Sequence, residues 1–477
     1  MEYEKVIGLE VHCELQTHSK MFSCAPVTFK EEPNTKVNEF DLSLPGTMPV
    51  LNKRAVEFAI KVCHALHMDI DECLCFDRKN YYYSDLPKGF QITQEKRPLG
   101  KDGYLDIYVD GQPMRISIVR LHMEEDTAKQ LHFDNYTLID YNRAGIPLIE
   151  IVTKPCIHNG KQAAAYLEQL RQVFLYTGVS DAKMEEGSMR CDVNISLRQK
   201  NTNQLGTRTE IKNVNSISYV QKAIEYETLR QEEILSHGGT ITQETRRYDE
   251  FAQKTVVMRT KGDHVDYKYY TEPNILPIRL DPEWIFSLKR ELPMMPYERE
   301  KLYMNHYHLS FNDAHQLVFH KELSDFFEKT IETCQEYQLV CHWILGDVLA
   351  YLNKNNLRLE ETKLKPEHLG EIINFINRGI ISSKQAKQVF DIVIKDGKNP
   401  KHIIEEKNLK QISDPCLLTT IINDILDENS QSVQDYAAGK SRAKSFLVGQ
   451  IMKKTKGQAN PQITNDILEK LLKERIS

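Results

Sequence analysis

The sequence lacks the features that would place it in several common protein classes. No apolar run approaches the roughly 18 residues of a membrane-spanning helix. The first residues also lack an apolar segment followed by a small-residue cleavage site, so we expect neither a spanning helix nor a secretory signal. None of the 10 cysteines forms a C-x-x-C pair, which argues against zinc-ribbon and thioredoxin sites. We therefore expect a cytoplasmic protein with reduced thiols.

One group of cysteines and histidines is dense enough to be weighed as a metal site. Cys63 and His67 are four residues apart in an expected helix, and Cys73 and Cys75 follow closely. The C-x-C spacing is poor for structural zinc. Cys63 also fits the apolar face of the helix, so the alternatives are a metal site and ordinary packing. Zinc is not expected on balance.

Common nucleotide- and metal-binding motifs are absent as well. The chain has no G-x-G-x-x-G and no H-E-x-x-H, and Gly439-Lys440-Ser441 lacks the first glycine of a P-loop, because Gln434 stands there. A bound nucleotide would therefore be held by a sheet and by basic side chains. The candidates are Arg78, Lys79, Arg190, Arg208 and Lys212.

What is present indicates a folded protein of several domains. The chain has 477 residues, of which 40% are hydrophobic and 27% charged, and roughly 100–200 residues per domain suggests two to four domains. The sequence pattern of residues 1–293 predicts the strands of an antiparallel sheet. Three helices interrupt them, near 52–67, 161–177 and 218–236. After a proline-rich link the pattern is helical. We predict an α+β fold, with a cradle domain (1–293), a helical domain (294–405) and a small helical tail (406–477).

Alternate positions of several predicted strands carry charged side chains. Glu10, His12 and Glu14 share one face of the first strand, Arg190 and Asp192 share a face of another, and Arg208, Glu210 and Lys212 share a face of a third. A solvated sheet face would also be polar. However, Glu, His, Asp and Asn are poor strand formers, so their repetition suggests a charged floor.

Further carboxylates lie at the ends or inside of apolar strands. Glu124, Glu125 and Asp126 end one strand, and Glu150 stands inside an apolar run. A buried carboxylate must be paired or must bind a metal. Ion pairing with Arg120 or Arg143 and metal binding are the two alternatives. Oxygen ligands with one histidine would suit Mg²⁺ or Mn²⁺ better than zinc.

Aromatic and basic segments suggest contacts with nucleic acid. Residues 77–83 and 266–270 interleave tyrosines with charged residues, which suits either stacking on bases or half-buried packing. The whole chain has a net charge of -6, but residues 436–477 contain nine basic and three acidic residues. These basic residues either form a solvated helix face or contact phosphates. The candidates for phosphate contacts are Lys440, Lys444, Lys453 and Lys454.

Segments spread along the whole chain resemble the B subunits of bacterial-type aspartyl/glutamyl-tRNA amidotransferases. They include Val6-Ile7-Gly8-Leu9-Glu10-Val11-His12 and Leu121-His122-Met123-Glu124-Glu125-Asp126, together with residues 44–52, 76–81, 85–89, 147–151, 183–188, 210–213, 243–247 and 457–461. The resemblance implies a cradle-shaped head, a helical domain and a tail.

The resemblance also implies a reaction and its partners. The subunit would phosphorylate the side-chain carboxylate of Glu on the glutamine tRNA, or Asp on the asparagine tRNA, with ATP and Mg²⁺ (Mn²⁺ being possible). Ammonia would then displace phosphate, with glutamine as the amide donor. An amidase subunit that supplies ammonia and a small third subunit would complete a heterotrimer. The alternative is a non-catalytic tRNA-binding scaffold whose carboxylates are structural ion pairs.

Site residues follow from the same resemblance. His12, Glu125 and Glu150 look like metal ligands, and strand phasing leaves open whether Glu124 or Glu125 points inward. The other residues assigned to the catalytic floor are Glu10, Glu124, Asp192 and Glu210, and those assigned to ATP or substrate are Arg78, Lys79, Tyr81, Lys88, Arg190, Arg208 and Lys212.

Overall fold

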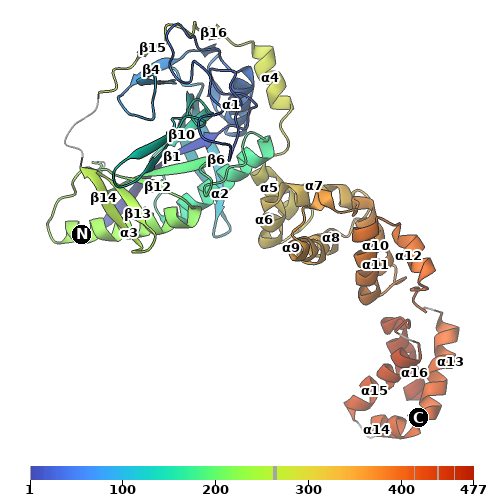
Figure 1. Ribbon diagram of the computed structural model, residues 1–477. Helices are drawn as coiled ribbons and strands as arrows, with labels where there is room; N and C mark the ends of the chain where they lie inside the picture. Colours follow the sequence, from blue (N-terminus) through green and yellow to red (C-terminus); the bar gives the residue numbers. More distant parts are fainter. Residues whose placement is uncertain are drawn as a thin grey trace. The chain divides into compact units, whose positions relative to one another are not determined.

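The computed structural model of the chain describes residues 2–202, 204–260, 266–412, 414–437, 440–455 and 457–476. It separates into two compact units, residues 1–299 and 300–477, which are coloured blue to yellow and gold to red in Figure 1. The boundary falls within helix α5 (Pro296–Asn305), just after the predicted proline-rich link. The further division near residue 405 stays a prediction.

The first unit is built on a sheet of nine strands, in the order β14-β13-β12-β11-β1-β10-β7-β6-β2. Its strands pair antiparallel, as predicted, except that β12 and β13 are parallel. That pair is parallel because helix α3 (Ile217–Ser236) carries the chain from the end of β12 back to the start of β13. The strands are β1 (Tyr3–Glu14), β2 (Asp69–Ile70), β6 (Gly100–Val109), β7 (Gln112–Glu125), β10 (Pro147–Thr153), β11 (Met189–Gln199), β12 (Thr209–Val214), β13 (Glu244–Asp249) and β14 (Lys254–Thr260).

The two faces of this sheet differ because strand side chains alternate. Leu9 and Val11 of β1 are fully buried in a core that also contains residues of α3 and of helix α2 (Gly160–Thr177). Both helices lie on this apolar face (Figure 1). The opposite face therefore carries the ionisable residues of the strands.

The helices of the first unit begin at residues that suit helix starts. Asn52, Asn159 and Ser216 cap helix α1 (Lys53–Ala65), α2 and α3, and each side chain accepts a backbone N–H of the first turn. Gly178 ends α2 in a left-handed conformation with φ of 67°. The three helices expected in this part of the sequence are thus confirmed, within one or two residues at each end.

Short strands form smaller sheets beside the large one. One has the order β15-β4-β5, and two others pair β16 with β3 and β8 with β9. Arg78 and Lys79 are adjacent on β4, so their side chains leave opposite faces of that strand. The bounds are β3 (Cys73–Leu74), β4 (Asp77–Asn80), β5 (Phe90–Thr93), β8 (Lys129–His132), β9 (Thr137–Asp140), β15 (Tyr270–Thr271) and β16 (Ile278–Arg279), followed by helix α4 (Pro282–Arg290).

The second unit is helical, which confirms the predicted change of pattern and the α+β class. A π-helical turn (Ile344–Val348) joins α8 to α9, so the two run on as one helix with a bulge at its centre. The helices are α6 (Phe311–Phe319), α7 (Lys321–Ile331), α8 (Tyr337–Trp343), α9 (Leu349–Asn355), a 3-10 turn (Leu359–Glu361), α10 (Pro366–Asn377), α11 (Ser383–Asp396), α12 (Pro400–Glu406), α13 (Pro415–Glu428), α14 (Ser430–Ala437), α15 (Ser441–Lys454) and α16 (Pro461–Ile476).

The last four helices share a small apolar core. Leu447 and Ile451 of α15 pack with Ile422, Leu468 and Leu472 of α13 and α16. Helix α15 begins at Ser441, and residue 439 of the Gly439-Lys440-Ser441 segment lies outside the described residues. Among the described helices of the chain, none is both long and apolar enough to cross a membrane.

A buried ionic network joins α3 to the edge of the large sheet. The Glu227 side chain is completely buried and contacts Arg230 at 2.6 Å and Arg246 at 3.4 Å. It also accepts hydrogen bonds from Gln231 and Thr255, each at 2.8 Å. One carboxylate therefore holds α3, β13 and β14 together.

Replacing Glu227 with Ala should destabilise this part of the first unit by about 3 kcal/mol, because the substitution leaves Arg230 and Arg246 with one buried carboxylate, that of Glu244, in place of two. Urea unfolding followed by hydrogen exchange of residues 244–260 would measure the loss. The matched control is Glu225→Ala at an exposed position of the same helix, for which less than about 0.5 kcal/mol is expected. Equal losses in the two variants would contradict the network's role.

Candidate active site

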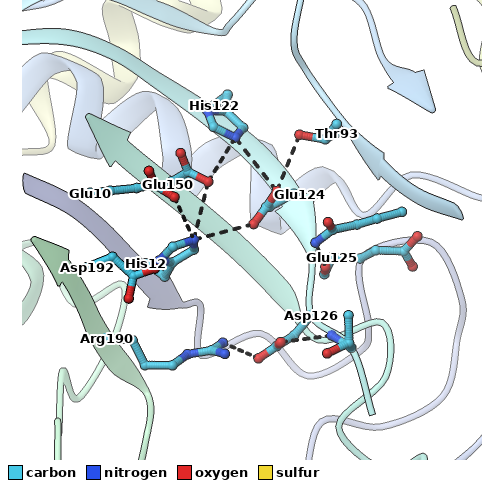
Figure 2. A network of polar contacts seen from close by, with 12 residues as sticks. Glu10, His12, Thr93, His122, Glu124, Glu125, Asp126, Glu150, Arg190 and Asp192 are labelled. Atoms are coloured by element: carbon cyan, nitrogen blue, oxygen red, sulfur yellow. Dashed lines mark hydrogen bonds and ion pairs between the residues drawn. The ribbon is translucent and has the colours of Figure 1, made fainter. Parts of the chain in front are cut away.

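The centre of the large sheet brings ionisable residues from four strands to one face. In the pairing register, His12 of β1 lies opposite both Glu150 of β10 and Arg190 of β11, and Glu150 lies opposite His122 of β7. Residues directly opposite in antiparallel strands project to the same side. Figure 2 shows the resulting row of side chains above the strands.

Two histidines stand on either side of a shared pair of carboxylates. His12 Nε2 lies 3.3 Å from Glu150 Oε2, 3.8 Å from Glu10 Oε1 and 4.0 Å from Glu124 Oε1. His122 Nε2 lies 3.5 Å from the same Glu150 oxygen and 3.7 Å from Glu124 Oε2. Two sets of side chains, Glu10–His12–Glu150 and His122–Glu124–Glu150, place their ligand atoms close enough to hold a metal ion.

The proton affinity of these groups depends on their mutual charges. Burial alone lowers the pKa of His12, but the hydrogen bond and charge of Glu150, with the charge of Glu124, outweigh it and raise that pKa to about 9. The same balance raises the pKa of His122 to about 9. Burial raises the pKa of Glu150, but the two imidazoles hold it well below the ordinary value. Without a metal, protonated imidazoles are the counter-ions of these carboxylates.

Glu124, rather than Glu125, faces this cluster. The Glu125 side chain accepts hydrogen bonds from Lys88 Nζ at 2.8 Å and from the backbone N–H of Ile92 at 3.1 Å. Successive side chains of a strand point to opposite faces, so the two neighbours are separated by β7 itself. The structure thus brings His12 and Glu150 together with Glu124, and places Glu125 in a different set of contacts.

A second buried group lies at the end of the row. Arg190 contacts Asp126 directly and Glu14 at 3.6 Å, and Arg143 lies 3.8 Å from Asp126. Burial raises the pKa of Asp126, but the two guanidinium groups outweigh it and lower that pKa to about 2. Arg190 is therefore engaged by the charged carboxylate of Asp126 (Figure 2).

The opposite end of the row is also paired. Lys212 Nζ lies 2.9 Å from Asp192 and 3.3 Å from Glu210, and Thr245 donates a hydrogen bond to Glu210 at 2.9 Å. Burial lowers the pKa of Lys212, but the two carboxylates raise it above its ordinary value. The predicted floor residues Asp192 and Glu210 thus surround one charged lysine.

A cavity of about 960 Å³ opens over this floor. Its walls include a lysine without a carboxylate partner: the ammonium group of Lys79 lies over the rings of Tyr267, at 5.1 Å, and Tyr81, at 5.8 Å. No described carboxylate lies within ion-pair distance of it. Of the predicted residues, the structure places His12, Lys79, Tyr81, Arg190, Asp192 and Lys212 around this cavity.

Three predicted nucleotide-binding residues lie elsewhere. Arg78 and Lys88 line a separate cavity of about 180 Å³. The guanidinium of Arg78 makes two hydrogen bonds with Glu272, at 2.5 and 3.1 Å. Arg208 is exposed just before β12 and lines neither cavity. Side-chain alternation on β4 explains why Arg78 and Lys79 line different cavities.

Most of the predicted tail lysines are engaged in ion pairs. Lys440 lies 3.0 Å from Asp435, Lys444 contacts Glu469, and Lys454 lies 3.2 Å from Glu428. Lys453 and Arg442, by contrast, are exposed on α15 and form no ion pair with a described residue. Phe446, 47% exposed, lies between these two positions along the helix.

The cysteine cluster does not gather as a set of ligands. Cys63 is buried in the core, while Cys73 and Cys75 are half-buried, with their sulfur atoms 3.6 Å apart. Within the described residues, the possible metal-binding groups are those of the sheet floor.

Sequence reasoning overlooked His122. The residue stands two positions before Glu124, the same spacing that marked Glu10 and His12 on β1. Applying the alternation rule to the strand that ends at Glu125 would have placed His122 and Glu124 on one face.

Comparisons with known proteins agree over the whole chain. A family model described as the GatB/GatE catalytic domain matches residues 5–286, and one described as the GatB domain matches residues 325–472. The B subunit of the aspartyl/glutamyl-tRNA(Asn/Gln) amidotransferase of Staphylococcus haemolyticus is 53% identical over 475 residues, which cover 100% of both chains. The proteins of the same name from Staphylococcus carnosus and Staphylococcus aureus strain JH9 are 51% and 52% identical over the same length.

The charge balance around His12 gives a testable titration. Without divalent ions, His12 should keep its proton up to about pH 9, and Glu150→Gln should lower this pKa, because the substitution removes the hydrogen bond and the charge that most strongly oppose the effect of burial. The folded pKa exceeds the unfolded value of about 6.5. Protonated His12 therefore stabilises the fold fully below pH 6.5, and this contribution disappears as the pH rises to about 9.

NMR of histidine-labelled protein, with the His12 signal assigned from a His12→Gln variant, would measure the titration. A midpoint near 6.5 in the unsubstituted protein would contradict the assigned charge balance.

Proposed function

The chain belongs to the aspartyl/glutamyl-tRNA amidotransferase B subunits, and from this premise we propose that its sheet floor activates the side chain of a misacylated tRNA by phosphorylation with ATP. Membership makes it a subunit of a multi-subunit, tRNA-dependent enzyme that forms a carbon–nitrogen bond. The observation that supports the proposal is the row of carboxylates and imidazoles beneath a cavity of about 960 Å³.

The proposed chemistry follows from the poor reactivity of a carboxylate toward ammonia. A carboxylate oxygen of the tRNA-bound Glu attacks the γ-phosphorus of ATP, the bond from that phosphorus to the bridging oxygen breaks, and ADP leaves. Ammonia then attacks the carbonyl carbon of the acyl phosphate, a proton is lost, and phosphate leaves with the electrons of the carbon–oxygen bond. Phosphoryl transfer depends chiefly on positioning and charge neutralisation, which fixed side chains on a rigid sheet can supply.

The floor has the donor set that Mg²⁺ or Mn²⁺ requires. Glu10, Glu150 and Glu124 offer carboxylate oxygens and His12 offers a nitrogen, all on one face of the sheet. We propose these residues as metal ligands, with Glu124 in the position that the resemblance gave to Glu125. A bound divalent ion would neutralise the charge of the phosphates. His12 must lose its proton to act as a ligand, so ion binding should release protons.

Other residues of the cavity suit the remaining charges of the substrates. Lys79 carries a positive charge without a carboxylate partner, and burial among tyrosines strengthens its attraction for phosphate. Arg190 and Lys212 are held in place by Asp126 and Asp192, so they can orient an anion without moving. We propose Lys79, Tyr81, Arg190 and Lys212 as the nucleotide and substrate contacts of this cavity.

Ammonia must be produced by another protein. We propose that a glutaminase partner subunit hydrolyses glutamine and that a small third subunit completes a heterotrimer, as the resemblance implies. The enzyme would then be a glutamine-hydrolysing ligase that works where misacylated tRNA is found, in the cytoplasm. Whether the substrate carries Glu on the glutamine tRNA or Asp on the asparagine tRNA is decided by assaying both.

The central experiment is amidation of misacylated tRNA by the purified complex. ATP turnover should require the misacylated tRNA, and Glu150→Gln should lower the amidation rate by about 100-fold or more, because both imidazoles lose their shared carboxylate. The control Glu57→Gln, which removes an exposed helix ion pair with Arg54, should leave the rate unchanged. Full amidation by Glu150→Gln would favour the alternative of a non-catalytic tRNA-binding scaffold.

The tail offers a second test, in which two double variants remove the same charge. Arg442→Ala with Lys453→Ala should weaken tRNA binding and reduce the salt slope by about two, because about one phosphate contact is lost per residue. Lys440→Ala with Lys444→Ala should have a smaller effect, because Asp435 and Glu469 already engage those lysines.

Filter binding of tRNA at several salt concentrations would compare the two pairs. Equal slopes in both variants and in the unsubstituted protein would contradict a role of the tail in binding phosphates.

A further inference from the structure

We propose that Asp85 binds the α-ammonium group of the amino acid carried by the misacylated tRNA. This inference rests on the proposed function, because it adds a contact for the same substrate in the same cavity. Asp85 lies on the segment between β4 and β5 and lines the cavity of about 960 Å³ above the sheet floor. It belongs to neither of the possible metal-binding groups found among the described residues.

The first argument is that the Asp85 side chain has no partner within the described part of the chain. Its Oδ1 atom is shielded from solvent and accepts no hydrogen bond there, and no described basic side chain forms an ion pair with the carboxylate. By contrast, Asp126 and Asp192 of the floor each contact a basic side chain. Buried polar groups normally make hydrogen bonds, and a partly buried charge requires a counter-charge. A cationic ligand would supply it.

The second argument is that the protein fixes the position of Asp85 without using its carboxylate. The Asp85 carbonyl accepts a hydrogen bond from the backbone N–H of Ala128 at 2.9 Å. The carbonyl of the preceding Ser84 accepts one from the Tyr141 hydroxyl at 3.2 Å, and its hydroxyl accepts one from the Gln130 amide at 2.9 Å. These contacts hold the segment in place, so the carboxylate remains available to a ligand in the cavity.

The third argument is the match between the charges of the cavity and those of the substrates. Lys79 and Asp85 line the same cavity, and neither has a partner of opposite charge among the described residues. An esterified Glu or Asp carries the same two charges, on its side-chain carboxylate and on its α-ammonium group. An unpaired carboxylate repels the phosphates of ATP. The α-ammonium group is the cation that the two substrates offer to Asp85.

The fourth argument is that the neighbours of Asp85 suit the end of a tRNA. Tyr82 and Tyr83 line the same cavity and are 98% and 61% exposed, and exposed aromatic rings commonly stack on unpaired bases of RNA. Burial raises the pKa of Tyr81, and the charges of Glu124 and Asp85 raise it further. Asp85 therefore acts on the part of the cavity that the floor carboxylates also reach, next to rings that would hold the terminal nucleotide.

The competing interpretation is that Asp85 is a general base that takes a proton from the attacking ammonia. A base acts in the reaction whatever stands at the α-position, whereas an ion pair requires a charged amino group there. The α-hydroxy analogue of Glu-tRNA separates the two roles, because a neutral hydroxyl of similar size replaces the ammonium group. The side chain, the ester and the tRNA are the same in both substrates.

The experiment measures kcat/KM for amidation and Kd for tRNA binding with the purified complex, at slightly acidic pH where the α-amino group is protonated. The analogue should be about 10-fold or more poorer than Glu-tRNA in both measurements, because a charge-assisted contact is lost. Asp85→Asn should lose a similar factor on Glu-tRNA and treat the two substrates alike. If this variant does not fold, Asp85→Ser is the second variant, with the same expected result.

The matched control is Asp134→Asn, at an exposed position in the turn between β8 and β9 that lines neither cavity. It removes the same charge and should keep the full discrimination between the two substrates. Equal use of both substrates by the unsubstituted complex would overturn the contact. So would a discrimination that Asp85→Asn retains, and a loss of kcat on both substrates in that case would identify a general base instead.

These outcomes differ from failure of the proposed function. If the complex amidates Glu-tRNA but does not distinguish it from the analogue, only the role of Asp85 fails. If it binds Glu-tRNA more tightly than the analogue through Asp85 but forms neither acyl phosphate nor amide, the proposed function fails and the contact stands.

Discussion

The pairing register of β1 is the constraint on which the rest of the site depends. This strand lies between β10 and β11, and its register sets His12 opposite Glu150 and Arg190 at once. A slip by one residue would turn His12 toward the helices and bring Val11 or Cys13 to the cavity. The register is held by the burial of alternate apolar residues under α2 and α3. Hydrophobic packing on one face thus positions the chemistry on the other.

Charge pairing divides the floor into two kinds of position. Asp126, Asp192 and Glu125 contact arginine or lysine, which stay charged at any ordinary pH. Glu124 and Glu150 instead face imidazoles, whose charge can be lost as protons. A carboxylate that is already paired with a lysine or an arginine is less available to bind a metal ion. The part of the floor that we propose for a divalent ion is therefore the part around the two histidines.

The sequence allowed the class of fold and half of the floor to be predicted, for a clear physical reason. Strand alternation is local, so Glu10 and His12 could be assigned to one face from β1 alone. Choosing between Glu124 and Glu125 needed the phase of β7 at its very end, where apolar alternation gives way to three consecutive acids. The parallel β12–β13 pair was also missed, because strand direction is set by the path of α3 and not by the strands themselves.

The count of basic residues misled in a similar way, since a positive side chain that a carboxylate already holds is less available to a phosphate than an unpaired one. Arg78 and Lys79 are neighbours in sequence, yet Arg78 is bound by Glu272 while Lys79 lies against tyrosine rings over the cavity. The tail shows the same contrast between Lys440, which faces Asp435, and Lys453, which is exposed without such a partner among the described residues. The net charge counts basic residues with and without a carboxylate partner alike, so it cannot distinguish between them. Three-dimensional pairing, which joins residues far apart in the chain, decides which cations remain for a ligand.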